Sequence, residues 1–246
     1  MSTPRPARTA TASAPEGAAV VRADRVTRCF GVGAATTVAV RGVSVTVAPH
    51  ARIALTGPSG SGKSTLLHLL ARLQRPTAGS ISWPGVDRPD ATSPDRIGLV
   101  GLVFQGRSLL PALDVMENVR LPLLFAGTSE SEATTRAAAA LDRLRIADLA
   151  GALPDTLSGG QAQRVAIARV LAAEPRLILA DEPTGQLDHA AAALVIDVLI
   201  EAADDLGAAL IVSTHDPVIA RRLPTEWAMR DGRLRPSIPA GHGAPR

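Results

Sequence analysis

The sequence has one lysine, no tyrosine and one cysteine. The lysine is Lys63, and the other 25 of the 26 basic residues are arginines. The single cysteine, Cys29, excludes an intrachain disulfide and favours a reducing compartment such as the cytosol. Aromatic residues make up only 2% of the chain, so a core must be built from alanine, valine, leucine and isoleucine.

Long apolar runs are also missing. No segment approaches the roughly 18 residues that a membrane-spanning helix needs. Residues 1–19 have no apolar signal segment and are rich in proline, alanine, serine and threonine, which predicts a disordered N-terminal tail. Residues 237–246 predict a second such tail. Between them, residues 20–236 have the composition of a globular domain.

The charge pattern does not point to nucleic acid. The net charge is +3 and the sequence pI is about 10.2, largely because arginine titrates very high and no tyrosine is present. The arginines are scattered, and the longest run is Arg221-Arg222. Because a clustered basic face is absent from the sequence, we expect no specific nucleic-acid binding. No Cys/His cluster occurs, so we also expect no protein-liganded zinc or iron.

Apolar strand patterns alternate with helical ones along the chain. Residues 20–28 and 38–47 show the alternation of antiparallel strands, and "RLILA" and "AALIVST" are continuous apolar runs typical of strands buried on both faces. Residues from about 107 to 169 are helical in character, and "EWAMRDGRLR" predicts a hairpin that turns at Asp231-Gly232. We therefore expect an α/β fold with a helical insertion and an antiparallel part.

A phosphate-binding loop follows the short strand "RIALT". Residues Gly57 to Ser64 fit the pattern G-x-x-x-x-G-K-[ST], in which glycines let backbone N–H groups form a nest for phosphate. The compact ammonium of Lys63 reaches the β- and γ-phosphates in a space that a planar guanidinium would not fill in the same way, which explains why the one lysine stands here. The expected nucleotide-binding residues are Gly57, Pro58, Ser59, Gly60, Ser61, Gly62, Lys63, Ser64 and Thr65, and the Ser64 hydroxyl is an expected Mg²⁺ ligand.

A second glycine-rich helix start lies in "LSGGQAQRVAIARVL". Ser158, Gly159, Gly160 and Gln161 stand just before or within the first turn of an apolar-periodic helix. A helix N-terminus offers free N–H groups and partial positive charge, so this segment is a candidate second phosphate-reading surface. The alternative is an ordinary serine-capped helix with a Gly-Gly lead-in.

Acidic and histidine side chains follow two buried strands. Asp181 ends "RLILAD" and is an expected Mg²⁺ ligand, while Glu182 directly after it is an expected general base for water attack on the γ-phosphate. His215, in "IVSTHD", is expected to bridge the γ-phosphate and the catalytic water. The alternatives are a solvated strand end for the two acids and a structural histidine for His215.

In this order, the motifs resemble those of the ATP-binding cassette ATPases, the nucleotide-binding subunits of ABC transporters, over about residues 20–236. The resemblance implies a P-loop NTPase core with a mainly parallel sheet, an antiparallel β subdomain, and an inserted α-helical subdomain at about 107–169. It also implies ATP and Mg²⁺ as cofactors and a homodimer in which ATP lies between Lys63 of one subunit and Ser158 of the other. Phe30 then matches the aromatic that stacks on adenine, Gln105 the glutamine that contacts Mg²⁺ and water, and Asp188 the aspartate that crosses the dimer interface.

"LVFQGRSLLPALDVMENVRLPLLFAG" and "LADEPTG" are similar to cassettes of the lipoprotein-release, macrolide-export, antimicrobial-peptide-export and cell-division type. Gln186 and Ala162 depart from that branch, which usually has Asn and Gln there. We expect an ATPase that powers a separate membrane permease, most simply an exporter, and that lies on the cytoplasmic face of the membrane. A cell-division regulator that acts through a membrane partner, or an importer ATPase, is the alternative. Leu109 and Leu110 are expected either to meet the permease or to belong to the core of the helical subdomain.

Overall fold

The computed structural model describes residues 19–31, 33–86, 99–106, 108–185 and 187–235. The two predicted tails, apart from Ala19, and Gln186 therefore lie outside the described residues. Ala19 itself, which the sequence pattern assigned to the N-terminal tail, is buried. The strands are β1 (Val21–Phe30), β2 (Thr37–Val47), β3 (Arg52–Thr56), β4 (Ala78–Ser82), β5 (Val100–Val103), β6 (Leu177–Asp181), β7 (Ala209–Thr214), β8 (Thr225–Arg230) and β9 (Arg233–Arg235). The α-helices are α1 (Lys63–Leu70), α2 (Val115–Phe125), α3 (Glu130–Arg143), α4 (Gly159–Leu171), α5 (His189–Asp205) and α6 (Pro217–Ala220), and short 3₁₀ turns cover Gly33–Ala35, Ala147–Leu149 and Pro154–Thr156.

The larger sheet has the strand order β5-β6-β7-β3-β8-β9. The first five of these strands run parallel, and β9 pairs antiparallel with β8. The β8–β9 turn contains Asp231 and Gly232 with φ of 52° and 75°, as the Asp-Gly pair predicted. The carboxyl ends of β3, β6 and β7 lie along one edge of this sheet, where the phosphate loop and the acidic residues emerge.

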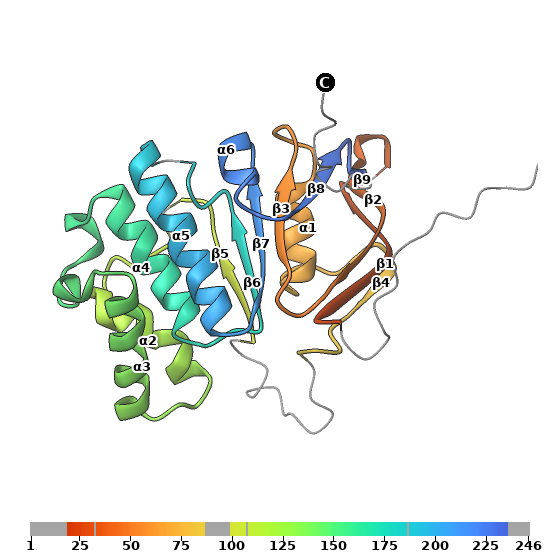
Figure 1. The fold of residues 1–246 in the computed structure, drawn as a ribbon. Coiled ribbons are helices and arrows are strands. Elements are labelled where there is room, and N and C mark those ends of the chain that lie inside the picture. The colour runs from red at the N-terminus through yellow and green to blue at the C-terminus, as the bar shows by residue number, and fades with distance from the viewer. Residues whose placement is uncertain (1–18, 32, 87–98, 107, 186, 236–246) are drawn as a thin grey trace, which may run out of the picture.

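A smaller antiparallel sheet with the order β2-β1-β4 packs beside the larger one (Figure 1). β1 pairs with β2 from Val21 opposite Val47 to Phe30 opposite Thr37, with three register shifts on the way. The antiparallel strands that the sequence predicted are thus confirmed, and Phe30 stands at the end of one of them.

Two hydrophobic cores lie on the two faces of the larger sheet. Alternate residues of β6 enter different cores, with Leu177 and Leu179 in one and Ile178 and Ala180 in the other. The first core also contains α1 and the valines of the small sheet, and the second contains α5 and the inserted helices α2 to α4. Figure 1 shows α1 between the two sheets and α4 and α5 on the opposite side of the larger one.

The helical insertion is a bundle of α2, α3 and α4 that packs against this second core. Asp114 caps α2 through a capping box with Glu117, and Ser129 caps α3. The insertion ends at Leu171, two residues beyond the expected boundary. The α/β architecture predicted from the sequence is confirmed. In the part of the chain that the structure describes, no helix has both the length and the apolar character that a bilayer span requires.

Candidate active site

The phosphate loop connects β3 to α1 through a strained, glycine-dependent path. Gly57, Gly60 and Gly62 have φ of 145°, 75° and 104°, which side chains rarely tolerate. A Cβ on Gly57 would stand 2.1 Å from the carbonyl oxygen of Met229, and one on Gly62 would stand 2.2 Å from that of Ala39. The loop is therefore held close against two other backbone segments, and only glycine fits at these two positions.

The N-terminus of α1 has no side-chain cap. Gly62 is the N-cap residue, and no side chain accepts from the first turn of the helix. The hydroxyl of Ser61 is buried and makes no hydrogen bond within the described residues. Unsatisfied donors and the helix dipole together favour an anion at this end, so the loop fits a nucleotide phosphate. Pro58, Ser59 and Gly60 are exposed, and Ser64 and Thr65 follow in the first helical turn.

Lys63 points back over the loop that precedes it. Its side chain is only 5% exposed, and its Nζ lies 2.9 Å from the Gly57 carbonyl oxygen and 3.3 Å from that of Pro58. A third partner is the carboxylate of Glu182, whose Oε1 lies 3.4 Å from Nζ. The ammonium is thus held at the loop by neighbours from two different segments.

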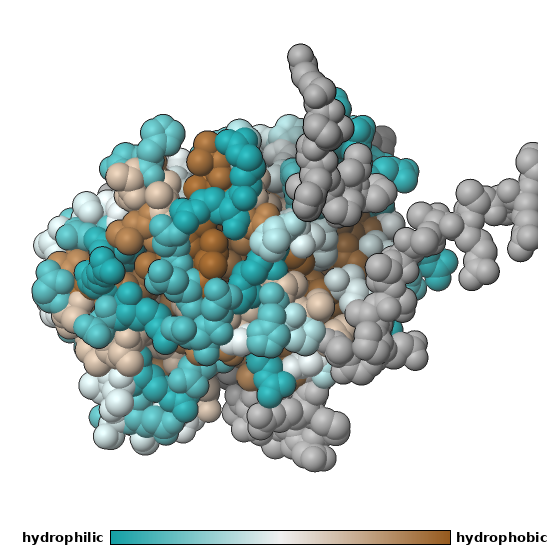
Figure 2. Space-filling view, viewed as in Figure 1, coloured by the Kyte–Doolittle hydropathy of each residue, from teal (hydrophilic) through white to brown (hydrophobic). Residues whose placement is uncertain are grey.

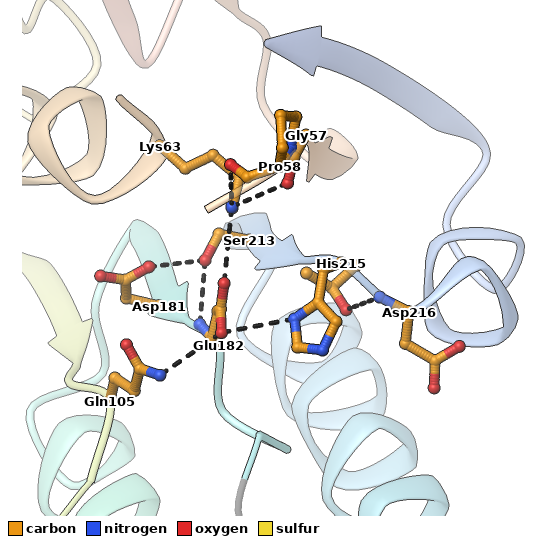
Figure 3. A network of polar contacts seen from close by, with 10 residues as sticks. Gly57, Pro58, Lys63, Gln105, Asp181, Glu182, Ser213, His215 and Asp216 are labelled. Atoms are coloured by element: carbon orange, nitrogen blue, oxygen red, sulfur yellow. Dashed lines mark hydrogen bonds and ion pairs between the residues drawn. The ribbon is translucent and has the colours of Figure 1, made fainter. Parts of the chain in front are cut away.

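Glu182 is the point where four predicted site residues meet (Figure 3). Its Oε2 accepts from Gln105 Nε2 at 3.3 Å and lies 3.4 Å from His215 Nδ1, while its Oε1 faces Lys63. The backbone of Glu182 has a φ of 43°, a left-handed turn that carries the side chain from the end of β6 into the site. The structure therefore brings Lys63, Gln105 and His215 around one carboxylate.

Ser213 is a site neighbour that the sequence reasoning missed. Its fully buried hydroxyl donates to Asp181 Oδ1 at 2.6 Å and accepts from the Glu182 N–H at 2.9 Å. One hydroxyl thus holds the buried carboxylate and the strained turn of the next residue. A serine inside the apolar run "LIVST" was the available signal, because a buried hydroxyl needs a partner.

The predicted magnesium ligands are oxygen donors of the type that Mg²⁺ prefers. Asp181 ends β6 with 5% exposure, Ser64 is exposed at the start of α1, and Gln105 follows β5 with its Nε2 turned to Glu182. A buried carboxylate needs compensation for its charge, and among the described residues the Asp181 carboxylate accepts a hydrogen bond from the neutral Ser213 hydroxyl but has no ion-pair partner. The donor set fits a magnesium ion held through these three side chains and water.

The second glycine-rich segment starts α4 with a complete capping box. The Ser158 hydroxyl accepts from Gln161 N–H at 3.2 Å, and the Gln161 side chain accepts from Ser158 N–H at 2.8 Å. The ordinary serine-capped helix and the exposed glycine N-terminus are therefore both present. The capping box, Gly159, Gly160 and Asp188 line a hollow of about 360 Å³.

Asp188 caps α5 by accepting from Ala191 N–H at 2.8 Å and is exposed. Gly159 also lines a smaller hollow of about 80 Å³ together with Glu182. Within the described ranges, however, no hydrogen bond or ion pair joins the Ser158 segment or Asp188 to Glu182 or to the three side chains around it. Over α4 and α5, hydrophilic and hydrophobic residues are interspersed on the face seen in Figure 2.

Phe30 is exposed at the end of β1, so it is not a core aromatic. The guanidinium carbon of Arg28 lies 4.7 Å from the centroid of its ring. The sequence reasoning did not foresee this contact.

An apolar hollow of about 440 Å³ lies where β5 meets the helical insertion. Phe104, Leu121, Pro122 and Phe125 line it, and Phe125 is 71% exposed. Arg169 also lines it and donates to the backbone oxygen and the hydroxyl of Ser108, while burial lowers the pKa of its guanidinium.

The two leucines that were expected to meet a permease or form core differ from each other. Leu109 is half-buried and packs against the second core, which contains α5 and the inserted helices, whereas Leu110 is 46% exposed. Neither lines the apolar hollow, so the exposed apolar surface here is formed mainly by the phenylalanines.

Comparisons with known proteins agree with this geometry. The family model described as ABC transporter matches residues 40–185, which is more than half of the chain. A lipoprotein-releasing system ATP-binding protein, LolD 2 of Caulobacter vibrioides, is 43% identical over 79% of this chain and 87% of its own length. The LolD protein of Alcanivorax borkumensis is 40% identical over 88% of this chain and 96% of its own. The pyoverdine export ATP-binding/permease protein PvdT of Pseudomonas entomophila is 43% identical, and the chain covers 32% of that longer protein.

Among solved structures, the dimeric ATP-binding cassette MJ0796 bound to ADP and Pi in a post-hydrolysis state has a TM-score of 0.80. It shares 32% sequence identity with this chain, over 91% of this chain and all of that one. In this chain, the phosphate loop, the carboxylates at the end of β6 and the LSGGQ helix start thus occur together in a fold similar to that of a known ATP-binding cassette. On this evidence the chain belongs to the ABC transporter family, as its ATP-binding cassette.

Proposed function

We propose that this cassette hydrolyses ATP to ADP and phosphate, with Mg²⁺, and that the reaction powers a separate membrane permease. The observation that carries the catalytic part is the arrangement of Lys63, Gln105 and His215 around the carboxylate of Glu182. A carboxylate at the end of a buried strand, next to a phosphate loop, has the position of a general base for water.

The chain's own residues divide the chemistry among them. The loop N–H groups and Lys63 bind the phosphates, and Lys63 leaves Glu182 as it does so. Glu182 then accepts the proton of the attacking water, while Gln105 and His215 orient that water and contact the γ-phosphate. Mg²⁺, when held by Ser64, Gln105 and Asp181, supplies charge stabilisation to the transferring phosphoryl group.

The functional unit that we propose is a homodimer with ATP between two cassettes. Ser158, Gly159, Gly160, Gln161 and Asp188 would complete the site of the partner subunit. Ser158, Gly159 and Asp188 are exposed, and Gly160 and Gln161 are half-buried, which supports this arrangement. Within the described part of the chain, no hydrogen bond or ion pair joins these residues to the Glu182 group, which supports it further. The MJ0796 structures are dimers, which supports the same arrangement.

The proposed permease contact is the apolar hollow with Phe104 and Phe125, together with Leu110. Its position beside Gln105 would let a membrane partner act on the active site. The LolD and PvdT relatives support an exporter of the lipoprotein-release kind, and the cassette would then sit on the cytoplasmic face of the membrane through its permease.

Replacing Glu182 with Gln tests the catalytic role. The amide keeps the shape but cannot accept the proton, so steady-state hydrolysis should fall about 10²–10⁴-fold while ATP still binds. Glu132→Gln is the control, because it removes a carboxylate from α3, far from the loop in the sequence. We expect the Glu182 variant, but not the control, to elute as an ATP-bound dimer in size-exclusion chromatography. Near-normal hydrolysis by Glu182→Gln would remove the proposed base.

Replacing Phe125 or Leu110 with Ser tests the permease contact. Both residues are exposed, Phe125 more than Leu110, so the melting temperature and basal hydrolysis of the isolated subunit should stay near wild type. The free energy of association with the permease should weaken by several kcal/mol if the site is a binding hot spot, so less permease should co-purify. Leu109→Ser should instead lower the melting temperature, because Leu109 packs on the core. Undiminished co-purification of both exposed variants would place the permease elsewhere.

A further inference from the structure

The C-terminal end of β1 carries an arginine and a phenylalanine whose side chains contact each other. Arg28 and Phe30 are two residues apart near the C-terminal end of β1, on either side of a register shift between Arg28 and Cys29. The guanidinium carbon lies over the ring, 4.7 Å from its centroid. This stacking is favourable because the face of an aromatic ring is electron-rich.

The Arg28 guanidinium also makes a hydrogen bond to a backbone carbonyl group. Arg28 Nη1 donates to the Arg75 carbonyl oxygen at 3.0 Å, in the segment that follows α1. Its Nε is buried and makes no hydrogen bond within the described residues. The ring of Phe30 is therefore a principal neighbour of the cation, and the two side chains fix each other.

We propose that Arg28 is a positioning residue for the nucleotide: it covers one face of Phe30 and sets the ring so that the purine base stacks on the other. This inference rests on the proposed ATP-binding function and on Phe30 as the base-stacking residue. Arg75 lies beyond the C-terminal end of α1, whereas the phosphate loop precedes its N-terminal end. The carbonyl group that holds Arg28 thus comes from the segment after α1 and not from the phosphate loop.

Fixing the ring strengthens base binding without touching the phosphates. An exposed phenylalanine at a strand end loses side-chain freedom when a base stacks on it, and a ring already held by Arg28 loses less. The effect applies only to ligands that have a base. Removal of the guanidinium should therefore weaken ADP binding about three- to tenfold and leave the binding of inorganic pyrophosphate unchanged.

The experiment compares these two ligands on the purified full-length chain. Arg28→Met keeps the length of the side chain and removes the cation, and Arg28→Lys restores a cation without the planar group. Arg22→Met is the matched control, because Arg22 lies in the same strand and pairs with Thr46 and Ser82 in the sheet. We expect weaker ADP binding for Arg28→Met, a partial rescue for Arg28→Lys and no change for the control. With ATP, KM should rise for Arg28→Met while kcat at saturation stays constant.

A Phe30→Ala variant and the double variant separate the inference from the function it rests on. Phe30→Ala should also weaken ADP selectively, and Arg28→Met should add nothing in that background, because the arginine acts through the ring. If Phe30→Ala weakens ADP but Arg28→Met does not, the role of Arg28 is wrong and base stacking stands. If Phe30→Ala leaves ADP binding unchanged, base stacking and the role of Arg28 both fail.

Two further results would also overturn the role of Arg28. Equal losses for ADP and pyrophosphate would mean that the variant damages the site as a whole. Tighter ADP binding by Arg28→Met would mean that the guanidinium covers the face that the base needs.

Discussion

Two glycine-rich helix starts, those of α1 and α4, differ in how their first turns are satisfied. α1 begins after Gly62, whose φ of 104° and missing side chain leave the helix without a cap of its own. α4 begins after Ser158, which closes a capping box with Gln161. The N-terminus of α1 would therefore gain stabilisation from a bound anion, whereas that of α4 is already stabilised by its own capping box.

The surroundings of the two helix starts differ in the same sense. Lys63 is 5% exposed and held by carbonyl groups and Glu182, whereas Ser158 and Gly159 are exposed. The N-terminus of α1 is thus surrounded by groups of its own chain, whereas the N-terminus of α4 is exposed at the surface. This difference is what the proposed dimer needs, because an exposed start is free to face the phosphates of a partner.

The largest effect on ATP hydrolysis is expected from Lys63→Arg, which tests the N-terminus of α1. The substitution keeps the charge, but the wider guanidinium does not fit between the Gly57 carbonyl and Glu182. Hydrolysis should fall by about 10²-fold or more, as for the loss of a donor aimed at developing charge. Arg25→Lys, at a highly exposed position, is the control for exchanging the two basic residues. A steady-state ATPase assay decides, and wild-type rates would mean that lysine is not required here.

A smaller effect separates the two starts by stability. In Gly62→Ala the new Cβ would stand 2.2 Å from the Ala39 carbonyl oxygen at a φ of 104°, so the melting temperature should drop by about 5 °C or more. Gly159→Ala meets no atom within 4 Å and should leave the melting temperature unchanged or slightly higher. Its ATPase rate should nevertheless fall, because in the proposed dimer the added methyl would face the partner's nucleotide. Normal hydrolysis by Gly159→Ala would contradict the role of the exposed start.

The smallest effect concerns the cap itself. Ser158→Ala should lower the stability by about 1 kcal/mol, which thermal or chemical denaturation can measure. Asp114→Ala is the matched control, because Asp114 forms the same kind of capping box at the start of α2. Both variants should lose similar stability, but only Ser158→Ala should also slow hydrolysis. Equal ATP hydrolysis rates in the two variants would mean that Ser158 only caps the helix and has no role in hydrolysis.

Local patterns predicted most of the elements correctly. The apolar runs before Asp181 and His215 are buried parallel strands, and the Asp231-Gly232 turn and the glycine loop formed where their residue types require. The contacts of Ser213, Arg28 and Arg169 were not predicted. Each joins segments that are far apart in the sequence, by 31, 47 and 61 residues respectively. The sequence also did not predict that Leu109 packs on the core while Leu110 is exposed, because this depends on the helices that surround them.

The sequence by itself determined the phosphate loop, because its chemistry depends on residue types within a few positions of one another. Glycines with left-handed backbones, one compact ammonium and a helix start are local properties. Only the tertiary structure decided that Glu182 meets Lys63, Gln105 and His215, since these residues come from the ends of different strands or the start of a helix. The parallel order of β5, β6, β7 and β3 places those ends at one edge, and the burial of alternate strand residues in two cores holds that order.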